Sequence, residues 1–259
     1  MALSEIEVRV DGPRGDITLN RPDKLNPLST TTLNELVSAA RHLDTLPSVK
    51  VVVVSGNGRA FSAGADLASF APNTRGAAVN PREAADAGRR MADAIEAMRA
   101  VTVAGIHGHC IGGGLVLAAA CDLRIAAADT RFSIPEIDLG IPLAWGGIPR
   151  LVREIGPART KELVMTCRPF GAAEALTAGF LNKVVTEQDL AGAVDEMVAM
   201  LASKPALPLT ATKQHTNAVT ESMVGPGRAW SDADALVTAL QDPESRAAAT
   251  AYLNGLGRG

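Results

Sequence analysis

The chain has 259 residues, of which 47% are hydrophobic and 20% are charged, and this length allows one large domain or two small ones. Its 25 Lys and Arg residues against 28 Asp and Glu residues give a net charge of −3, which argues against a protein that binds nucleic acid or an anionic membrane surface. The longest apolar run, residues 111–121, is shorter than the roughly 20 residues that span a bilayer, and the N-terminus lacks the pattern of a signal peptide, so we expect a globular protein of the cytoplasm.

In the first half of the chain, predicted strands alternate with predicted helices. Apolar and polar residues alternate over residues 5–10, and a Gly-Pro-Arg-Gly turn separates them from a second short strand at 16–19. The β-branched run at 51–54 predicts a strand that is buried on both faces. The other predicted elements are a helix capped within 29–32 whose apolar face spans 33–43, a helix at 83–100, a strand at 101–106, a helical segment at 112–120 and a strand at 121–125. This order is typical of parallel β-α units.

After about Pro135 the predicted elements are nearly all helices. They lie at 147–154, 158–166, 172–178, 187–201, 207–218 and 232–253, with one strand at 183–185. The segment 71–81 is small, polar and bounded by proline, which predicts an exposed loop. We therefore expect a β-rich first half followed by a helical second half, with no clear linker between them.

Two glycine-containing segments each follow a predicted strand. The first covers residues 60–67, and the second, 108–114, ends in the triplet Gly112–Gly114 directly before an apolar helix. Glycines there let the backbone approach a ligand and leave peptide N–H groups unpaired at the helix start. Such donors, together with the helix dipole, suit a developing oxyanion. Either segment alone could also be a plain turn or a site of tight helix packing.

The cysteines and histidines indicate no metal site. Cys110, Cys121 and Cys167 are odd in number and lack CxxC spacing, so the simplest interpretation is small core residues in a reducing compartment. His107 and His109 adjoin Cys110, but such neighbouring positions rarely converge on one ion, and we expect no bound metal.

Six ordered blocks carry a resemblance to a known family. They are 19–22 with 25–26, 60–66, 112–114 with 121–122, Phe132 with 135–136, 146–147 with 150–151, and 178–179. In order and spacing, this chain resembles the crotonase family, the enoyl-CoA hydratases and isomerases. The resemblance covers nearly the whole chain and thins after about Pro205.

The resemblance implies an α/β fold, a crotonase-like spiral of repeated β-β-α units with a helical C-terminal trimerisation region. Residues 1–200 would form the core for acyl-CoA binding and catalysis, and residues 201–259 a helical region for oligomerisation and pocket closure. It also implies an acyl-CoA thioester substrate, a homotrimer or dimer of trimers, and no cofactor, because coenzyme A is part of the substrate.

The family's site residues can be placed on this sequence. The backbone N–H groups of Ala65 and Gly113 would form an oxyanion hole for the thioester oxygen, and Glu136 would be the catalytic acid–base. The resemblance implies that the substrate-binding residues are Ala63, Gly64, Ala65, Asp66, Leu67, Gly112, Val116 and Trp145.

The sequence departs from the hydratase pattern at one acid–base position. Typical hydratases use two glutamates, but the first position holds Val116, and only Glu136, in a Pro-Glu pair, is present. A single desolvated glutamate suits a proton shuttle that shifts a double bond, so we expect isomerisation to be favoured over hydration. Some relatives hydrate with one glutamate, Asp138 is a weaker candidate helper, and Glu136 could also be a plain helix-start carboxylate. The alternative function is an acyl-CoA-binding homologue with little or no catalysis.

Two further departures concern substrate contacts. Trp145 is large for its position and could either wall the acyl pocket or pack beneath the start of the following helix. Several relatives carry C-terminal lysines that meet the CoA phosphates, whereas only Arg258 is available here, which puts those contacts in doubt.

Overall fold

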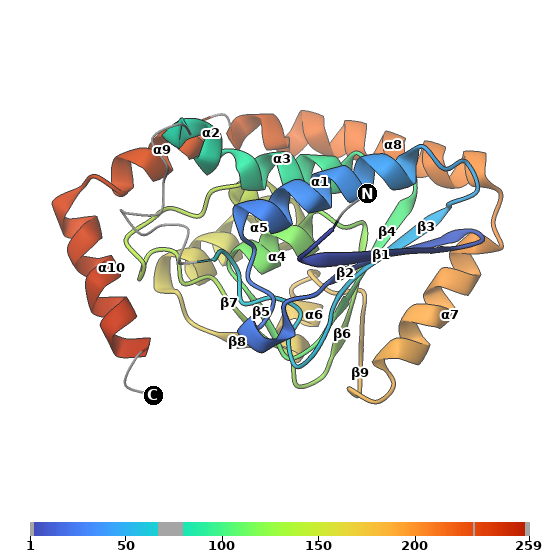
Figure 1. Ribbon diagram of the computed structural model, residues 1–259, viewed down its shortest axis with the longest axis horizontal. Coiled ribbons are helices and arrows are strands. Elements are labelled where there is room, and N and C mark those ends of the chain that lie inside the picture. The colour runs from blue at the N-terminus through green and yellow to red at the C-terminus, as the bar shows by residue number, and fades with distance from the viewer. Residues whose placement is uncertain (1–2, 67–79, 230, 257–259) are drawn as a thin grey trace.

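The computed structural model describes residues 3–66, 80–229 and 231–256; Leu67, Arg258 and most of the predicted loop at 71–81 lie outside the described residues. The strands are β1 (Ile6–Asp11), β2 (Arg14–Leu19), β3 (Val51–Gly56), β4 (Val101–Ile106), β5 (His109–Ile111), β6 (Leu123–Ala127), β7 (Arg131–Ser133), β8 (Phe170–Gly171) and β9 (Lys183–Val185). The helices are α1 (Thr30–Asp44), α2 (Pro81–Ala85), α3 (Ala87–Glu96), α4 (Gly113–Ala119), α5 (Gly147–Thr166), α6 (Ala172–Thr177), α7 (Leu190–Ala202), α8 (Ala206–Val224), α9 (Asp232–Ala239) and α10 (Pro243–Leu256), with 3-10 turns η1 (Pro22–Lys24) and η3 (Pro226–Ala229). Figure 1 shows their arrangement.

The main sheet has six strands in the order β1-β2-β3-β4-β6-β9. All neighbours are parallel except β1 and β2, which form an antiparallel hairpin. Gly12 in the hairpin turn has a φ of +54°, which glycine adopts readily. The predicted parallel β-α organisation is therefore confirmed, although the strand expected at 121–125 begins two residues later, at Leu123.

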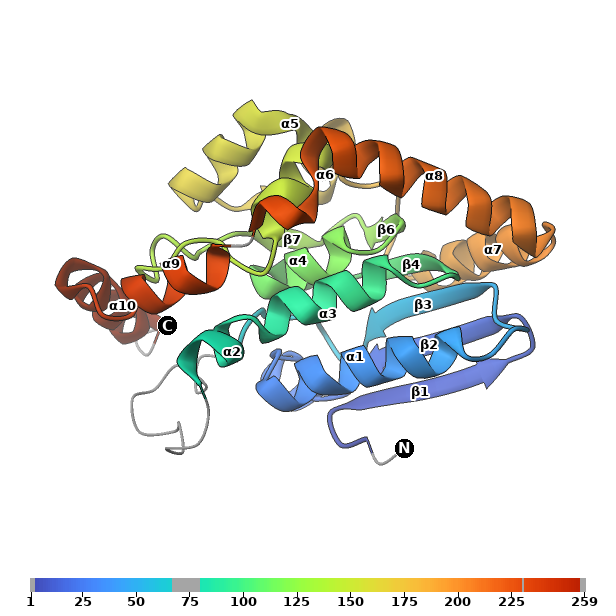
Figure 2. The ribbon, with the colours of Figure 1, turned by 90° about the horizontal axis from the view of Figure 1, so that it is seen from above.

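Helices cover both faces of this sheet. α1 and α3 run side by side over one face (Figure 2), while α7 packs against the other. Val52 and Val54 of β3 belong to the larger hydrophobic core with α1 and α3, whereas Val51 and Val53 pack with residues of α7 such as Val194. This arrangement confirms the prediction that the β-branched run is buried on both faces.

A second, three-stranded sheet in the order β5-β7-β8 was not predicted. Its strands have only two or three residues each, which is too short for an alternating pattern to be recognised. With it, the chain shows the expected β-β-α repeat three times, as β1-β2-α1, β4-β5-α4 and β6-β7-α5. The three cysteines are free and buried, as predicted.

The second half is helical as predicted, but three helix boundaries were wrong. The single helix expected at 232–253 is two helices, α9 and α10, because Pro243 cannot continue α9 and instead begins α10. The helix expected at 83–100 is α2 and α3, and it ends at Glu96. The helix expected at 207–218 continues to Val224. In the described part of the chain, no helix has the length and apolarity needed to cross a membrane.

The C-terminal helices attach to the core at two ends. In α8, the Lys213 ammonium is buried and lies 2.7 Å from a carboxylate oxygen of Asp122, which follows α4. α9 and α10 lie at the opposite end of the molecule from α7, as Figures 1 and 2 show. There α10 approaches the loop before α5 so closely that a Cβ atom on Gly140 would lie 2.1 Å from the Ser245 carbonyl oxygen.

Candidate active site

Backbone hydrogen bonds hold the two glycine-containing segments side by side. The Phe61 N–H donates to the His107 carbonyl, and the Ser62 N–H donates to the His109 carbonyl, both at 2.9 Å. Ser62 in turn accepts from the Ile111 N–H at 3.0 Å. The segment 60–66 therefore runs alongside β5 and brings its glycine turn to the start of α4.

Two backbone N–H groups at this junction have no hydrogen-bond partner among the residues that the structure describes. Ala65 follows Gly64, whose φ of +90° turns the chain, and Gly113 is the first residue of α4. Within the described residues, neither the Ala65 nor the Gly113 N–H donates a hydrogen bond. A Cβ atom on Gly64 would lie 2.7 Å from the Ile111 carbonyl oxygen and 3.4 Å from the Gly113 nitrogen. Glycine at position 64 is thus required for the two segments to approach this closely.

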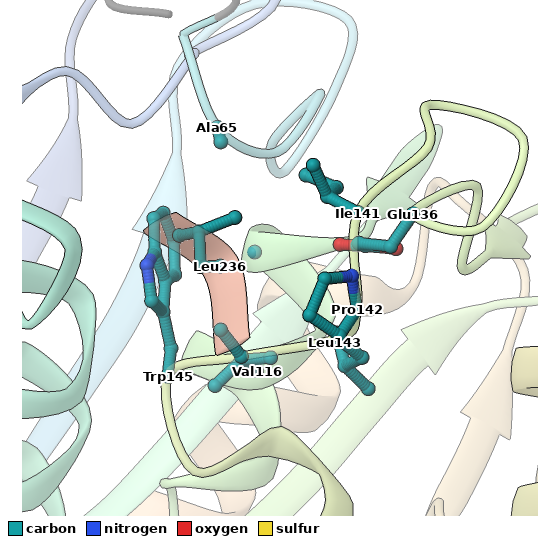
Figure 3. A pocket seen from close by; sticks show the side chains of 10 residues that line it. Ala65, Val116, Glu136, Ile141, Pro142, Leu143, Trp145 and Leu236 are labelled. Atoms are coloured by element: carbon teal, nitrogen blue, oxygen red, sulfur yellow. The ribbon is translucent and has the colours of Figure 1, made fainter. Parts of the chain in front are cut away.

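These residues border a small cavity of about 30 Å³. Its lining consists of Ala65, Gly113, Val116, Glu136, Ile141, Pro142, Leu143, Ala144, Trp145 and Leu236. In the view of Figure 3, Trp145 and Leu236 lie on one side of the cavity, and Glu136 and Pro142 lie on the other. The cavity is apolar except for the Glu136 carboxylate and the backbone groups.

Glu136 is partly buried, and one of its carboxylate oxygens is fully buried without a hydrogen-bond partner in the described part of the chain. Among the described residues, nothing donates to its Oε2 atom. Its Oε1 atom lies so near Gly112 that a Cβ atom on that glycine would be only 2.5 Å away. Burial disfavours the ionised form and raises the pKa of Glu136 to about 7. A carboxyl with this pKa can both accept and return a proton near neutral pH.

Val116 completes the same wall and brings no second acid. Its side chain is 1% exposed and lines the cavity from the first turns of α4. Among the described residues, Glu136 is the only carboxylate that lines the cavity, and Asp138 does not line it. The site therefore holds one titratable group facing a hydrophobic side chain.

The raised pKa of Glu136 predicts how stability depends on pH. The pKa of Glu136 is about 7 in the folded chain, against an ordinary value of 4.5. Its ionisation therefore leaves the free energy of unfolding unchanged below pH 4.5, and lowers it progressively as the pH rises from 4.5 through 7. The total loss of folding stability is about 3 kcal/mol. The free energy of unfolding of Glu136→Gln, relative to wild type, should thus increase by about 3 kcal/mol between pH 4 and pH 8, measured by urea denaturation. If the free energies of unfolding of the two proteins changed in parallel with pH, the prediction would be contradicted.

The structure brings together five of the predicted site residues, which line one cavity: Ala65, Gly113, Val116, Glu136 and Trp145. Ala63, Gly64, Asp66 and Gly112 adjoin it in the chain without lining it, and Leu67 lies outside the described residues. The Asp66 carboxylate pairs with Arg21 at 2.9 Å. In the described ranges, no group of three His, Cys, Asp or Glu side chains could hold a metal ion.

The sequence did not identify half of the residues that line the cavity. Ile141, Pro142, Leu143 and Ala144 are ordinary apolar residues before α5, and Leu236 comes from α9. Nothing in their residue types marks them as pocket residues. Of the two alternatives that the sequence left open for Trp145, the structure places the residue in the wall of the cavity. Its indole packs against Gly88 of α3 and Gly113 of α4, rather than beneath the start of α5.

Comparisons with known proteins agree with this arrangement. The family model described as enoyl-CoA hydratase/isomerase matches residues 15–256. A crotonyl-CoA hydratase of Syntrophomonas wolfei is 33% identical over 98% of this chain and 96% of its own, and a peroxisomal Delta(3,5)-Delta(2,4)-dienoyl-CoA isomerase of Arabidopsis thaliana is 35% identical over 82% of this chain and 80% of its own. The crystal structure of an enoyl-CoA hydratase from Mycobacterium avium subsp. paratuberculosis superposes with a TM-score of 0.87 at 27% identity, covering 96% of this chain and 99% of that one. The chain therefore belongs to the enoyl-CoA hydratase/isomerase family and has its fold.

Proposed function

We propose that this protein is an acyl-CoA enzyme that shifts the double bond of an enoyl-CoA in preference to hydrating it. The observation that carries the proposal is the pairing of Glu136 with Val116 in one cavity, where the described residues supply a single carboxylate. Hydration requires a positioned water and a proton delivered to carbon, which two carboxylates manage more easily than one. Moving a double bond requires one group that takes a proton and returns it.

The proposed reaction uses the Ala65 and Gly113 N–H groups and the Glu136 carboxylate. The thioester oxygen accepts from the Ala65 and Gly113 N–H groups, which stabilise the negative charge that develops there. Glu136 removes the proton between the carbonyl and the double bond of a 3-enoyl-CoA, and the electron pair moves onto the thioester oxygen as a dienolate. The protonated Glu136 then returns the proton to the far end of the dienolate, which gives the 2-enoyl-CoA. No cofactor is consumed, because coenzyme A enters and leaves as part of the substrate.

Turnover with two substrates tests the proposal. The purified protein is given 3-enoyl-CoA and 2-enoyl-CoA thioesters, and isomerisation and hydration are followed separately. Faster isomerisation than hydration is expected. Efficient hydration by the wild type would show that one glutamate suffices for hydration here. Binding of acyl-CoA without turnover of either substrate would favour the alternative function, an acyl-CoA-binding homologue, for which the replacement of the first acid–base residue by Val116 is the supporting observation.

A substitution at position 116 tests why isomerisation is preferred. Val116→Glu restores a second carboxylate to the cavity wall, and the ratio of hydration to isomerisation should rise. Thermal stability should fall, because an unpaired carboxylate loses several kcal/mol of solvation on burial and stays partly protonated. Both rates and the melting temperature are measured beside Val116→Gln, which adds a similar side chain that cannot ionise. A folded Val116→Glu protein with neither rate changed would show that position 116 does not face the reacting carbons.

We further propose that the protein assembles as a homotrimer or a dimer of trimers through its helical half. Large apolar side chains of α8 are exposed, with Leu207 at 79%, Met223 at 68% and Val219 at 59%. Side chains of this kind on one helix are commonly buried by a neighbouring subunit. Sedimentation equilibrium at micromolar concentration should give at least three times the 26.8 kDa mass of the chain; a monomer would contradict the proposal.

A further inference from the structure

The turn that carries Trp145 into the cavity has an unusual backbone. Trp145 has a φ of +61° and Gly146 a φ of +70°, so two consecutive residues are left-handed directly before α5. This conformation suits Gly146 but is unfavourable for a bulky residue such as tryptophan. The surrounding structure must therefore hold Trp145 in place.

The indole is wedged between two glycines. A Cβ atom on Gly88 of α3 would lie 1.9 Å from the indole Cδ2 atom, and one on Gly113 would lie 2.3 Å from its Cζ3 atom. The ring thus rests against the residue whose N–H is unpaired, and it forms the wall that faces Glu136 across the cavity in Figure 3. Because the indole forms one wall of this small cavity, any displacement of the ring changes the room available to a ligand.

Arg150 holds the turn from inside the protein. Its side chain is 0% exposed, and its Nη1 atom lies 3.4 Å from the Trp145 carbonyl oxygen and 3.2 Å from that of Gly146. Its Nη2 atom donates to Asp93 at 2.9 Å and to Glu96 at 2.6 Å, both in α3. The guanidinium therefore links α3 to Trp145 and Gly146. The carboxylates of Asp93 and Glu96 neutralise its charge.

A carboxylate on α9 holds the other side of the turn. Asp232 accepts from the Gly146 N–H at 2.9 Å, and Leu236, one turn later in α9, lines the cavity beside Trp145. The carbonyl of Gly146 is thus held by Arg150 and its N–H by Asp232. The position of the Trp145 indole is therefore set by the Arg150 guanidinium, which is bound to α3, and by the Asp232 carboxylate of α9.

We propose that Arg150 is a positioning residue that fixes the width of the acyl cavity, and with it the acyl chain length that the site accepts, by holding the Trp145–Gly146 turn. The assignment of an acyl ligand rests on the proposed function. Arginine suits this task because its planar fork bonds two carbonyls and two carboxylates at once, which a lysine ammonium cannot do. With the turn held, the cavity favours short acyl groups; with the turn released, the indole moves and longer chains enter.

Arg124 provides a matched control, since it is also buried and bonds both carbonyls and a carboxylate. It donates to the Phe180 and Cys121 carbonyls and lies 2.6 Å from Glu154, but it does not line the cavity or contact the turn. Arg150→Lys and Arg124→Lys should lower thermal stability similarly. A role of Arg150 in stability alone would therefore give the same results for both variants.

Binding of saturated thioesters, which cannot be turned over, measures the width of the cavity. Butanoyl-CoA and octanoyl-CoA are titrated by calorimetry into wild type and both variants. The wild-type preference for butanoyl-CoA should fall about tenfold or more in Arg150→Lys and remain unchanged in Arg124→Lys. An unchanged preference in a folded Arg150→Lys protein would overturn the proposal, as would an equal loss in both variants.

Tryptophan fluorescence gives a second measurement that needs no ligand. The chain has two tryptophans, so Trp230→Phe leaves Trp145 as the only one. In that background, acrylamide should quench Trp145 faster in Arg150→Lys than in wild type or Arg124→Lys. If no thioester binds any of the proteins, the proposed function fails, while the quenching still decides the role of Arg150. If Arg150→Lys does not fold, Glu96→Gln weakens one of the two carboxylate bonds that anchor Arg150 to α3. This variant should shift both the acyl preference and the quenching rate in the same direction, and no shift would overturn the proposal.

Discussion

Replacing Glu136 with glutamine should lower enoyl-CoA turnover by roughly 10²–10⁴-fold, the usual loss when a general base is removed. Glutamine keeps the shape and burial of the side chain but cannot take up a proton at neutral pH. The affinity for a saturated acyl-CoA should stay close to that of wild type, because the Ala65 and Gly113 N–H groups are untouched. Steady-state kinetics and calorimetric binding on the same preparation separate the two effects.

The pH dependence supplies an independent check of this assignment. A base must be ionised to act, so kcat/KM of the wild type should rise with pH through the Glu136 pKa of about 7. Residual activity of Glu136→Gln should lack that rise. Asp138→Asn is the matched control, since Asp138 is near in sequence but does not line the cavity, and it should keep most activity. Full activity in Glu136→Gln would assign the proton transfer to another group.

Gly64→Ala should also reduce turnover strongly, by roughly 10²–10³-fold, which is the typical effect of losing one oxyanion donor. The added methyl group would lie 2.7 Å from the Ile111 carbonyl oxygen at a φ of +90°. Since that oxygen belongs to the backbone of β5, relief requires the turn itself to move, and the Ala65 N–H moves with it. Turnover is measured under saturating substrate, with folding checked by circular dichroism.

Gly12→Ala separates backbone strain from damage to the site. Gly12 has a φ of +54°, and nothing lies within 4 Å of an added Cβ atom, so this variant bears the left-handed strain far from the cavity. It should lose about 1–2 kcal/mol of stability and keep its kcat. If Gly64→Ala shows a similar loss of stability but normal turnover, the Ala65 N–H is not a donor to the reacting oxygen.

The sequence predicted those parts of the fold that are marked by local chemistry. The run at 51–54 is β-branched throughout, and the strand is buried on both faces as expected. The capping pair Ser29 and Thr32 begins α1, and the Ser29 side chain accepts from the Thr32 N–H at 3.1 Å. The strands of the second sheet carry no such mark, because two or three residues form them only where a partner strand already lies alongside.

The residues of the candidate site fall into the same two groups, those that the sequence marks and those that only tertiary contacts reveal. Glu136 and the glycine segments are distinctive residues at a recognisable spacing, and the structure gathers them at one cavity. The roles of Leu236 and Arg150 depend instead on tertiary contacts. Leu236 resembles any core leucine of an amphipathic helix. Arg150 belongs to a block that resembles the family, but the sequence does not reveal that it bonds the Trp145 and Gly146 carbonyls. Such residues can be recognised only after the chain has folded.

During synthesis on the ribosome, the main sheet can form before the acyl cavity closes. β9, the last strand of that sheet, ends at Val185, whereas Leu236 and Asp232 belong to α9 and emerge later. Until then, the apolar wall that includes Val116 and Trp145 lacks its cover and is open to chaperones. A nascent chain arrested before α9 should hence already have a protease-resistant sheet but an unfinished site, so that substrate binding is acquired in the last stage of translation.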